Sequence, residues 1–419
     1  MKILVGMSGG VDSTIAAYIL KKQGHEIVGV NFNFVAENRG LENRMGELHE
    51  PATVGAMHCE PENRMGELYE PNQELLEISE KLGIKIISRD FSIEFREKVI
   101  TSFVHDYEEG ITPNPCALCN ATMKFDALLR LMKEEDADMV ATGHYANIVR
   151  IDNDSKNILN SEGRYCIKKS ENVQKDQSYM LYRLSQDQLS HIVFPLANMY
   201  KDDVRKIAAE LGLKVATKKD SQDVCFINDD YAEFIKEFEL GKGYKEKIAK
   251  GELSLAEIEK FPFFRKGEFV DENGVVLGYH KGIINYTIGQ RKGLNIAFGE
   301  RKFVKAIDVE KNRVVLSDNE SLKSSDFKIY DIVFSGKALE ELNGKCTYNA
   351  KLRYRHEGTA CDVDFTSFDY DNQIKNGASL NNFAVCHLSE PVRAITNGQA
   401  AVFYDDKDRI MFGGRILCD

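Results

Sequence analysis

The stretch Ser8-Gly-Gly-Val-Asp-Ser13 separates a short apolar segment, Ile3–Val5, from an amphipathic one that begins at Asp12. Two adjacent glycines let a backbone approach a phosphate closely, and the amino end of a helix directs N–H groups and a positive dipole at an anion. The serine hydroxyls add further donors. The lysine of a Walker loop and the G-x-G-x-x-G of a dinucleotide site are both missing. The stretch therefore predicts a phosphate-binding loop between a first strand and a first helix.

Apolar strands and helical patterns alternate along the first part of the chain. They predict strands over Ile3–Val5, Glu26–Asn31, Lys85–Asp90 and Met139–Thr142, and helices over Asp12–Gln23, Glu74–Leu82 and Glu94–Tyr107. This alternation is typical of an α/β fold, a parallel sheet with helices on both faces. In such sheets a ligand binds beyond the carboxyl ends of the strands, which is where the phosphate loop would lie.

The pattern changes after about residue 232. Lys242–Phe261 is charged and helix-like, and Asp271–Gly274 predicts the turn of a hairpin. From Lys302 on, alternating segments predict a small antiparallel β-barrel, with strands over Phe303–Ile307, Arg313–Leu316, Ala350–Tyr354, Ala400–Tyr404 and Ile410–Ile416. We therefore expect a catalytic domain over residues 1–232, a central domain over 233–297 and a C-terminal barrel over 298–419.

The composition restricts the class of protein further. A chain of 419 residues is long enough for two or three domains. A net charge of −11 argues against bulk electrostatic binding of nucleic acid, although a local basic face remains compatible with it. No apolar run is long enough to predict a membrane span, and the N-terminus indicates a strand, not a secretory signal. The nine cysteines form no disulfide framework, so the expected location is the reducing cytoplasm.

A decapeptide is duplicated inside an insert at about residues 36–72. Glu42–Pro51 and Glu62–Pro71 are identical at nine of ten positions with a period of 20. Two copies are too few for a solenoid, so we interpret them as a tandem duplication in a surface loop without a functional role. His49, His58 and Cys59 lie in surroundings too irregular to favour a metal site.

Several strings resemble known enzymes when they are taken together. The Ser8–Ser13 loop resembles the PP-loop of the ATP pyrophosphatases, which cleave ATP between the α- and β-phosphates. Further strings, in order, resemble the bacterial-type tRNA 2-thiouridylases (the MnmA family): Thr112–Asn120, Met123–Phe125, Ala141–Tyr145, Lys175–Tyr179, Lys219–Phe226, Tyr286–Leu294, Arg353–Arg355 and Gly398–Tyr404. The resemblance spans nearly the whole chain.

This resemblance implies a PP-loop catalytic domain, a small central domain and a barrel that helps to hold tRNA. The implied reaction is 2-thiolation of the wobble uridine, with ATP and Mg²⁺, by a monomer that receives sulfur from a persulfide donor. Cys119 and Cys225 would be the catalytic residues. The residues implied to bind ATP are Gly6, Met7, Ser8, Gly9, Gly10, Val11, Asp12, Ser13, Phe32 (usually Met in the family) and Gly143. Those implied to contact tRNA are Asn114, Pro115 and Cys116 at the target base, and His144, Lys175, Asp176, Gln177, Arg353, Tyr354 and Gln399.

The chemistry of the residues agrees with these implied roles. Adenylation turns a uracil oxygen into AMP, a good leaving group, and so makes attack by sulfur feasible. Asn114 and Pro115 match the N-cap and first position of a helix that continues through Met123. Cys116 and Cys119 would then lie in its first turns, where we expect the helix dipole to favour thiolates.

Cys116 departs from the family pattern, since most members have Asp there, and two interpretations stay open. In the first, Cys225 carries a persulfide, Cys119 resolves the product as a Cys119–Cys225 disulfide, and Cys116 is a bystander. In the second, Cys116, Cys119 and Cys225 hold a [4Fe–4S] cluster whose fourth iron binds hydrosulfide. Zinc is less favoured because no fourth ligand is evident. The other thiols are expected to be structural: Cys59, Cys166, Cys346, Cys361, Cys386 and Cys418.

Two other classes share some of these features. An amide- or argininosuccinate-forming ligase has a Ser-Gly-Gly loop but needs no paired cysteines and no tRNA-binding barrel. A non-enzymatic sulfur carrier or tRNA-binding protein would not need the intact Ser8–Ser13 loop together with both family cysteines.

Overall fold

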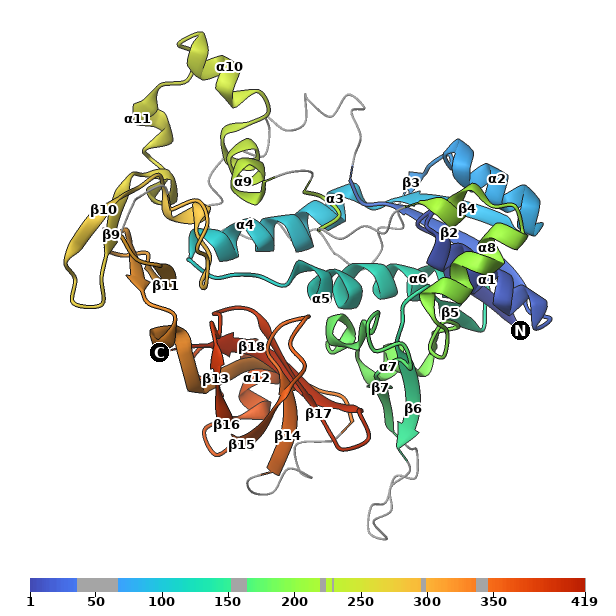
Figure 1. The fold of residues 1–419 in the computed structure, drawn as a ribbon. Helices are drawn as coiled ribbons and strands as arrows, with labels where there is room; N and C mark the ends of the chain where they lie inside the picture. The colour runs from blue at the N-terminus through green and yellow to red at the C-terminus, as the bar shows by residue number, and fades with distance from the viewer. Residues whose placement is uncertain are drawn as a thin grey trace.

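The computed structural model describes residues 1–35, 67–151, 164–218, 224–227, 230–294, 299–336 and 346–418. Most of the duplicated insert, including His49, His58 and Cys59, lies outside these residues. Figure 1 shows a parallel sheet with its helices, a central unit with small helices and a sheet, and a C-terminal barrel. No helix of the described chain is both long and apolar enough to cross a membrane.

The first sheet has the strand order β3-β4-β2-β1-β5-β8. Its strands are β1 (Lys2–Gly6), β2 (Glu26–Asn33), β3 (Glu67–Leu68), β4 (Lys85–Asp90), β5 (Met139–Ala141) and β8 (Ile192–Val193). All pairings are parallel except that of β3 with β4. This confirms the expected parallel sheet.

Both faces of this sheet are covered, which explains why β1 is apolar without alternation. Ile3 and Val5 pack with α1 (Val11–Lys22), α2 (Gln73–Leu82) and α8 (Lys201–Glu210) in one apolar cluster. Leu4 faces the other way, into a cluster with α6 (Phe125–Glu134). The expected helices on both faces are therefore present.

Two long helices leave the sheet and run between the other two parts of the molecule (Figure 1). The first consists of α3 (Ser92–Phe95), the π-helical η4 (Arg96–Ile100) and α4 (Thr101–Glu108). The second consists of α5 (Pro115–Cys119), the π-helical η5 (Asn120–Lys124) and α6. Single π-turns inside α-helices are frequent at functional sites. The second π-turn follows Cys119 directly.

The central unit contains α9 (Tyr231–Leu240), α10 (Tyr244–Ala249), α11 (Leu255–Ile258) and a sheet of order β10-β9-β12-β11. Its strands are β9 (Gly267–Val270), β10 (Val276–His280), β11 (Phe303–Asp308) and β12 (Arg313–Ser317). The sequence pattern assigns β11 and β12 to the barrel, but β12 pairs with β9 of the central unit. The central unit therefore reaches Ser317, and the boundary expected at residues 297–298 is too early. The boundary at 232 stays a prediction.

The C-terminal barrel is closed, with the order β13-β16-β15-β14-β17-β18. The strands are β13 (Lys323–Phe334), β14 (Cys346–Lys351), β15 (Thr359–Asp364), β16 (Ala384–Arg393), β17 (Ala400–Tyr404) and β18 (Ile410–Leu417), and α12 (Tyr370–Asn376) is the helix beside them. Thr359, Cys361 and Val363 of β15 point inward and alternate with exposed residues. Closure leaves no free sheet edge.

The barrel and the catalytic domain share one apolar core. Ala400, Val402 and Tyr404 of β17 pack in the same cluster as Leu4 and Val28 of the parallel sheet. The ribbon of β6 (Asn147–Ile151) and β7 (Arg164–Lys168) and the short helices η6 (Ser178–Leu181) and α7 (Gln186–Ser190) lie between them. The barrel is therefore built into the catalytic domain and is not a separate appendage.

Candidate active site

The loop between β1 and α1 has the geometry of an anion cradle. Gly9 adopts a φ of +72°, which favours glycine, and the Ser8 N–H donates to Ser13 Oγ at 3.2 Å. Gly10 is the N-cap of α1 and provides no side chain to cap its N–H groups. The amino end of this twelve-residue helix therefore presents backbone donors at the carboxyl edge of the sheet.

Gly143 lies directly against this loop, and its contact with adenosine stays a prediction. A Cβ atom at Gly143 would lie 2.6 Å from the carbonyl carbon of Asp12 and from the nitrogen of Ser13. The segment after β5 can therefore pack on the first turn of α1 only with glycine at this position.

Two residues that the sequence analysis did not assign join the loop at Asp12. Lys201 Nζ lies 2.8 and 2.7 Å from the two carboxylate oxygens of Asp12. The hydroxyl of Tyr145 donates to Asp12 Oδ1 at 2.8 Å. Tyr145 lies inside a family-like string, but no local pattern marks Lys201, because it lies far along the chain and meets Asp12 only in the fold.

Phe32 lies near the carboxyl end of β2, at the same edge of the sheet. Its ring stacks on Phe34 with a centroid distance of 5.3 Å and meets Phe91 edge to face at 5.5 Å. The side chain is only partly buried, so one side of this aromatic group remains accessible. Contact with adenosine stays a prediction.

The cysteine-bearing helix begins where the sequence predicts. Asn114 is its N-cap and accepts the Ala117 N–H at 3.2 Å, and Pro115 is the first helical residue. Asn114 Nδ2 is a buried amide nitrogen near the Tyr179 hydroxyl, but it forms no hydrogen bond of good geometry in the described part of the chain. Cys116 is exposed, whereas Cys119 is only 9% exposed. A partly unsatisfied amide thus lies beside the two thiols.

The expected acidification of the thiols is wrong for this conformation. Cys116 and Cys225 are exposed as residues, but partial desolvation of their thiols raises the pKa of both, and burial raises the pKa of Cys119 to about 11. The ammonium of Lys124 acts in the opposite direction on all three pKa values. Loss of hydration therefore outweighs this cation, and the thiols are mostly protonated at neutral pH.

The three cysteines are close enough for the charge of one to affect the pKa of another. A negative charge on Cys225 would raise the pKa of both Cys116 and Cys119, so Cys225 lies within electrostatic range of the helix. Lys124, which also donates to Asn120 Oδ1 at 2.9 Å, is the cation that they share. Cys119 and Cys225 thus lie within electrostatic range of each other and of Lys124, although they belong to distant parts of the chain.

The three thiols do not fit a metal site as they stand. Where the structure describes the chain, no three His, Cys, Asp or Glu side chains lie close enough together to hold a metal ion. Cys116, Cys119 and Cys225 all belong to the described residues, so this finding includes them. The cluster ligand set stays a hypothesis that this conformation does not support.

His144 follows β5, and Gln177, which precedes η6, contacts the neighbouring Tyr145. His144 Nδ1 forms a hydrogen bond with Thr142 Oγ1 at 2.7 Å, and burial, helped by Lys124, holds its pKa well below the usual 6.5, so the imidazole is neutral. Gln177 Oε1 accepts the Tyr145 N–H at 3.0 Å. Both side chains are half-buried, and their contact with tRNA stays a prediction.

Asp176 and Gln399 have internal partners that their implied tRNA contacts did not anticipate. Asp176 is 4% exposed, and its carboxylate accepts from the Ser170 N–H and the Ser178 hydroxyl. Gln399 Nε2 donates to the carbonyl oxygens of Thr112 at 3.3 Å and Pro113 at 3.0 Å. Gln399 therefore fastens the barrel to the segment that leads into the cysteine helix, and Asp176 orders its own loop.

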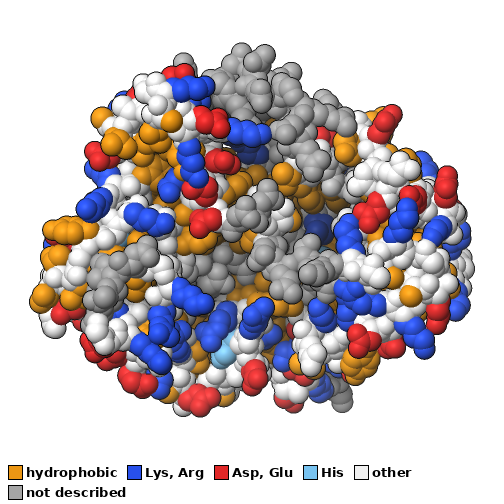
Figure 2. Space-filling view, turned by 45° about the horizontal axis from the view of Figure 1, so that its top comes forward, with side chains coloured by type: hydrophobic (Ala, Val, Ile, Leu, Met, Phe, Trp, Pro, Cys, Tyr) orange, Lys and Arg blue, Asp and Glu red, His pale blue; other side chains and the backbone are white. Residues whose placement is uncertain are grey.

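A basic surface surrounds Tyr354, which is 36% exposed. Burial and the carboxylate of Asp176 raise the pKa of Tyr354, whereas Lys175 and Arg355 lower it, so both cations lie within electrostatic range of the phenol. Arg353 is exposed next to it. Figure 2 shows lysine and arginine side chains gathered on the face that contains the barrel. This is the local basic face that the acidic net charge left possible.

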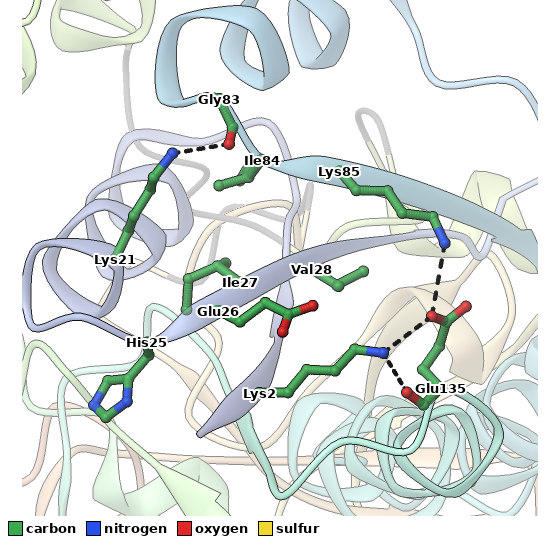
Figure 3. Close-up of a pocket in the computed structure, with 10 residues that line it drawn as sticks. All are labelled: Lys2, Lys21, His25, Glu26, Ile27, Val28, Gly83, Ile84, Lys85 and Glu135. Carbon is green, nitrogen blue, oxygen red and sulfur yellow. Dashed lines mark hydrogen bonds and ion pairs between the residues drawn. The ribbon is translucent and has the colours of Figure 1, made fainter.

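A cavity of about 400 Å³ lies elsewhere, at the amino ends of β1, β2 and β4 (Figure 3). Its lysines are already engaged: Lys21 Nζ binds the Gly83 carbonyl at 2.8 Å, and Lys2 and Lys85 each lie 3.6 Å from a carboxylate oxygen of Glu135. They stabilise the carboxyl ends of α2 and α6. The cavity is thus at the opposite edge from the phosphate loop.

The parallel sheet and its glycine-serine loop define a PP-loop domain of the kind found in ATP-utilising enzymes, here followed by a central sheet and a closed barrel. Three family models match the chain: "tRNA methyl transferase HUP domain" over residues 1–229, "tRNA methyl transferase PRC-barrel domain" over 258–318, and "Aminomethyltransferase beta-barrel domain" over 324–416. The second match ends at 318, in agreement with the end of β12.

Curated relatives match over nearly the whole chain. The tRNA-specific 2-thiouridylase MnmA of Clostridium acetobutylicum is 39% identical, and the match covers 99% of this chain and 99% of that relative. The tRNA-specific 2-thiouridylase MnmA 2 of Caldanaerobacter subterraneus subsp. tengcongensis is 40% identical, and the match covers 99% of this chain and 97% of that relative. A solved NMN synthetase from Francisella tularensis is 15% identical with a TM-score of 0.28, over 62% of this chain and 82% of that chain, which is too weak to support an argument. The chain belongs to the tRNA-specific 2-thiouridylase family.

Proposed function

We propose that this chain catalyses the ATP-dependent 2-thiolation of the wobble uridine of tRNA, with release of AMP and pyrophosphate. The observation that carries the proposal is that Cys119 and Cys225, from distant parts of the chain, lie within electrostatic range of each other and of Lys124. The ATP loop and Gly143 lie on the same domain as the cysteine helix. An activating site and a sulfur-transfer site therefore belong to one folded unit.

The first chemical step would be adenylation. The N–H groups at the start of α1 would hold the phosphates of ATP, with Mg²⁺ as counter-ion, and the uridine O2 would attack the α-phosphorus and displace pyrophosphate. The resulting C2–O–AMP bond has a good leaving group, which the free carbonyl lacks. We propose that the buried Asn114 Nδ2 donates a hydrogen bond to the base.

The second step would be sulfur transfer. A persulfide on Cys225, supplied by a cysteine desulfurase or sulfur-relay protein, would attack C2 through its terminal sulfur and expel AMP. The Cys119 thiolate would then attack Cys225 Sγ, form the Cys119–Cys225 disulfide and release the thiolated base. A thiol reductant would regenerate both thiols. Cys225 is exposed, as a group that receives sulfur from another protein must be.

Binding of tRNA is proposed for the basic surface around Tyr354. Lys175, Arg353 and Arg355 suit phosphate contacts, and Tyr354 can stack on a base. Lys351 Nζ lies 6.0 Å from the Tyr354 ring centroid and adds to the charge. We further propose that the protein acts as a monomer in the cytoplasm.

The decisive experiment is mass analysis of tRNA nucleosides after incubation with ATP and a persulfide donor. We expect 2-thiouridine from the wild type and none from Cys119→Ser or Cys225→Ser. Cys361→Ser is the matched control, because Cys361 is buried inside the barrel at 1% exposure, and it should retain activity. Absence of 2-thiouridine, or AMP release that does not require tRNA, would favour the carrier or the ligase class instead.

The third thiol, Cys116, keeps the cluster hypothesis testable. We derive no step through a cluster, since the three thiols do not form a ligand set here. Anaerobic reconstitution with iron and sulfide, followed by iron analysis and visible absorbance, should give no stoichiometric cluster. Stoichiometric iron that is lost in Cys116→Ala would replace the persulfide route with the cluster route.

A further inference from the structure

Lys201 is a buried cation at an unusual position. It is the first residue of α8, is 8% exposed, and places its ammonium 2.8 and 2.7 Å from the two carboxylate oxygens of Asp12. Tyr145 donates to the same carboxylate at 2.8 Å. The carboxylate of the phosphate loop is thus held by groups from two other segments of the chain.

Two physical effects oppose a lysine at this position. Removing an ammonium from water is unfavourable unless an opposite charge compensates it. The amino end of a helix is also the positive end of its dipole, where a cation is less stable than an anion. Asp202 and Asp203 occupy the same first turn but are exposed. The contact with Asp12 is the evident compensation for burying Lys201.

The role of this contact follows from the charge of the loop. Asp12 is the one ionisable residue between Gly6 and Ser13, and it lies in the first turn of α1. An uncompensated carboxylate there would repel the phosphates that the N–H groups attract. We propose that Lys201 is a positioning residue for ATP, which neutralises Asp12 and holds it away from the phosphate cradle. The inference rests on ATP binding at this loop but does not require the thiolation chemistry.

Two other roles for the pair give different results. If Lys201 contacted a phosphate directly, its loss would weaken binding whether or not Asp12 were charged. If Asp12 were a Mg²⁺ ligand, its own neutralisation would weaken binding. If Lys201 only neutralises Asp12, removal of both charges should restore what removal of the lysine alone abolishes.

The test is a double-mutant cycle on the full-length protein, read by calorimetric titration with ATP and, separately, with pyrophosphate. We expect Lys201→Met to weaken ATP binding about 10- to 100-fold, the effect of one unscreened charge a few ångströms from a phosphate. Under this proposal the Asp12 carboxylate itself makes no contact with ATP, in contrast to the contact that the family resemblance implies. Asp12→Asn should then bind ATP at least as tightly as the wild type, and the double variant should return to within about threefold of the wild type. Lys206→Met, an exposed lysine on the same helix, is the matched control and should bind normally.

Circular dichroism and thermal unfolding of each variant identify any that misfold, and the double variant keeps the test valid if Lys201→Met alone is unstable. A double variant as weak as Lys201→Met would overturn the proposal, and so would loss of ATP binding in Asp12→Asn. Because the readout is nucleotide binding without tRNA, failure of the thiolation assay and failure of this inference are distinguishable.

Discussion

Substitution of Lys124 by methionine should lower the reactivity of Cys119. The pKa of Cys119 is about 11, with Lys124 acting against the effect of burial. At pH 8 the thiolate is therefore about one part in a thousand of the thiol, three pH units below its pKa. An opposite charge close to an ionisable group commonly shifts its pKa by about 1–3 units. Because Lys124 favours the thiolate, its loss raises the pKa and reduces the thiolate about tenfold or more.

The assay is alkylation by iodoacetamide, a neutral reagent, with the rate at each cysteine followed by mass spectrometry between about pH 7 and 10. The wild-type rate at Cys119 should rise about tenfold per pH unit across this range, since the range lies below the pKa of about 11. Lys124→Met should follow a parallel line about tenfold lower. Lys133→Met, an exposed lysine on α6, should coincide with the wild type. A plateau below about pH 9, or identical rates in Lys124→Met, would refute the reasoning.

Three further predictions concern how the site is held together. Gly143→Ala should weaken ATP binding at least about tenfold in titration calorimetry with an unchanged circular dichroism spectrum, because its methyl would lie 2.6 Å from the Asp12 backbone. Gln399→Ala should reduce tRNA thiolation severalfold in a single-turnover assay and leave ATP binding unchanged, because its contacts are with the segment before the cysteine helix. Asp106→Asn should lower the thermal unfolding midpoint, since the mostly buried ion pair of Asp106 with Arg415, at 2.8 Å, joins α4 to the barrel and breaking such a pair costs about 3–5 kcal/mol.

The parts of the fold that the sequence predicts are those set by local pattern. The Ser8–Ser13 loop, the strand at Lys85–Asp90 and the helix start at Asn114 depend on residues a few positions apart, and all three are present. Strand partners depend on the whole chain. The alternation at Phe303–Ile307 and Arg313–Leu316 identifies two strands, but it does not indicate that β12 pairs with β9.

The same limit applies to the site. A helix dipole can be inferred from Asn114 and Pro115, so thiolates were expected at Cys119, but its pKa depends on the apolar cluster that surrounds it and that comes from distant segments. Lys201 was missed for the same reason, because only the packing of α8 beside α1 brings its ammonium to Asp12. The charge state of a side chain depends on its neighbours in space, whereas a backbone motif depends mainly on its neighbours in sequence.

The barrel covers apolar surface of the parallel-sheet domain. Val402 and Tyr404 lie in the same apolar cluster as Leu4 of the parallel sheet, and Tyr179 donates to the Ala400 carbonyl at 2.7 Å. Removing the barrel would expose this apolar surface and leave the Tyr179 hydroxyl without its acceptor, at about 1–3 kcal/mol for the hydroxyl alone. A chain that ends before β13 should therefore be insoluble or should bind a hydrophobic dye strongly.

The matched comparison is Tyr404→Phe in the full-length chain, which removes only the hydroxyl that meets Ser178 at 2.9 Å. This variant should fold, because the ring still fills the core. Its thermal unfolding midpoint should be slightly lower, because one buried hydrogen bond is lost. A soluble, cooperatively unfolding fragment without the barrel would contradict the shared core. The barrel thus orders the segments around Tyr179 and Pro113, and we expect it to affect catalysis through them.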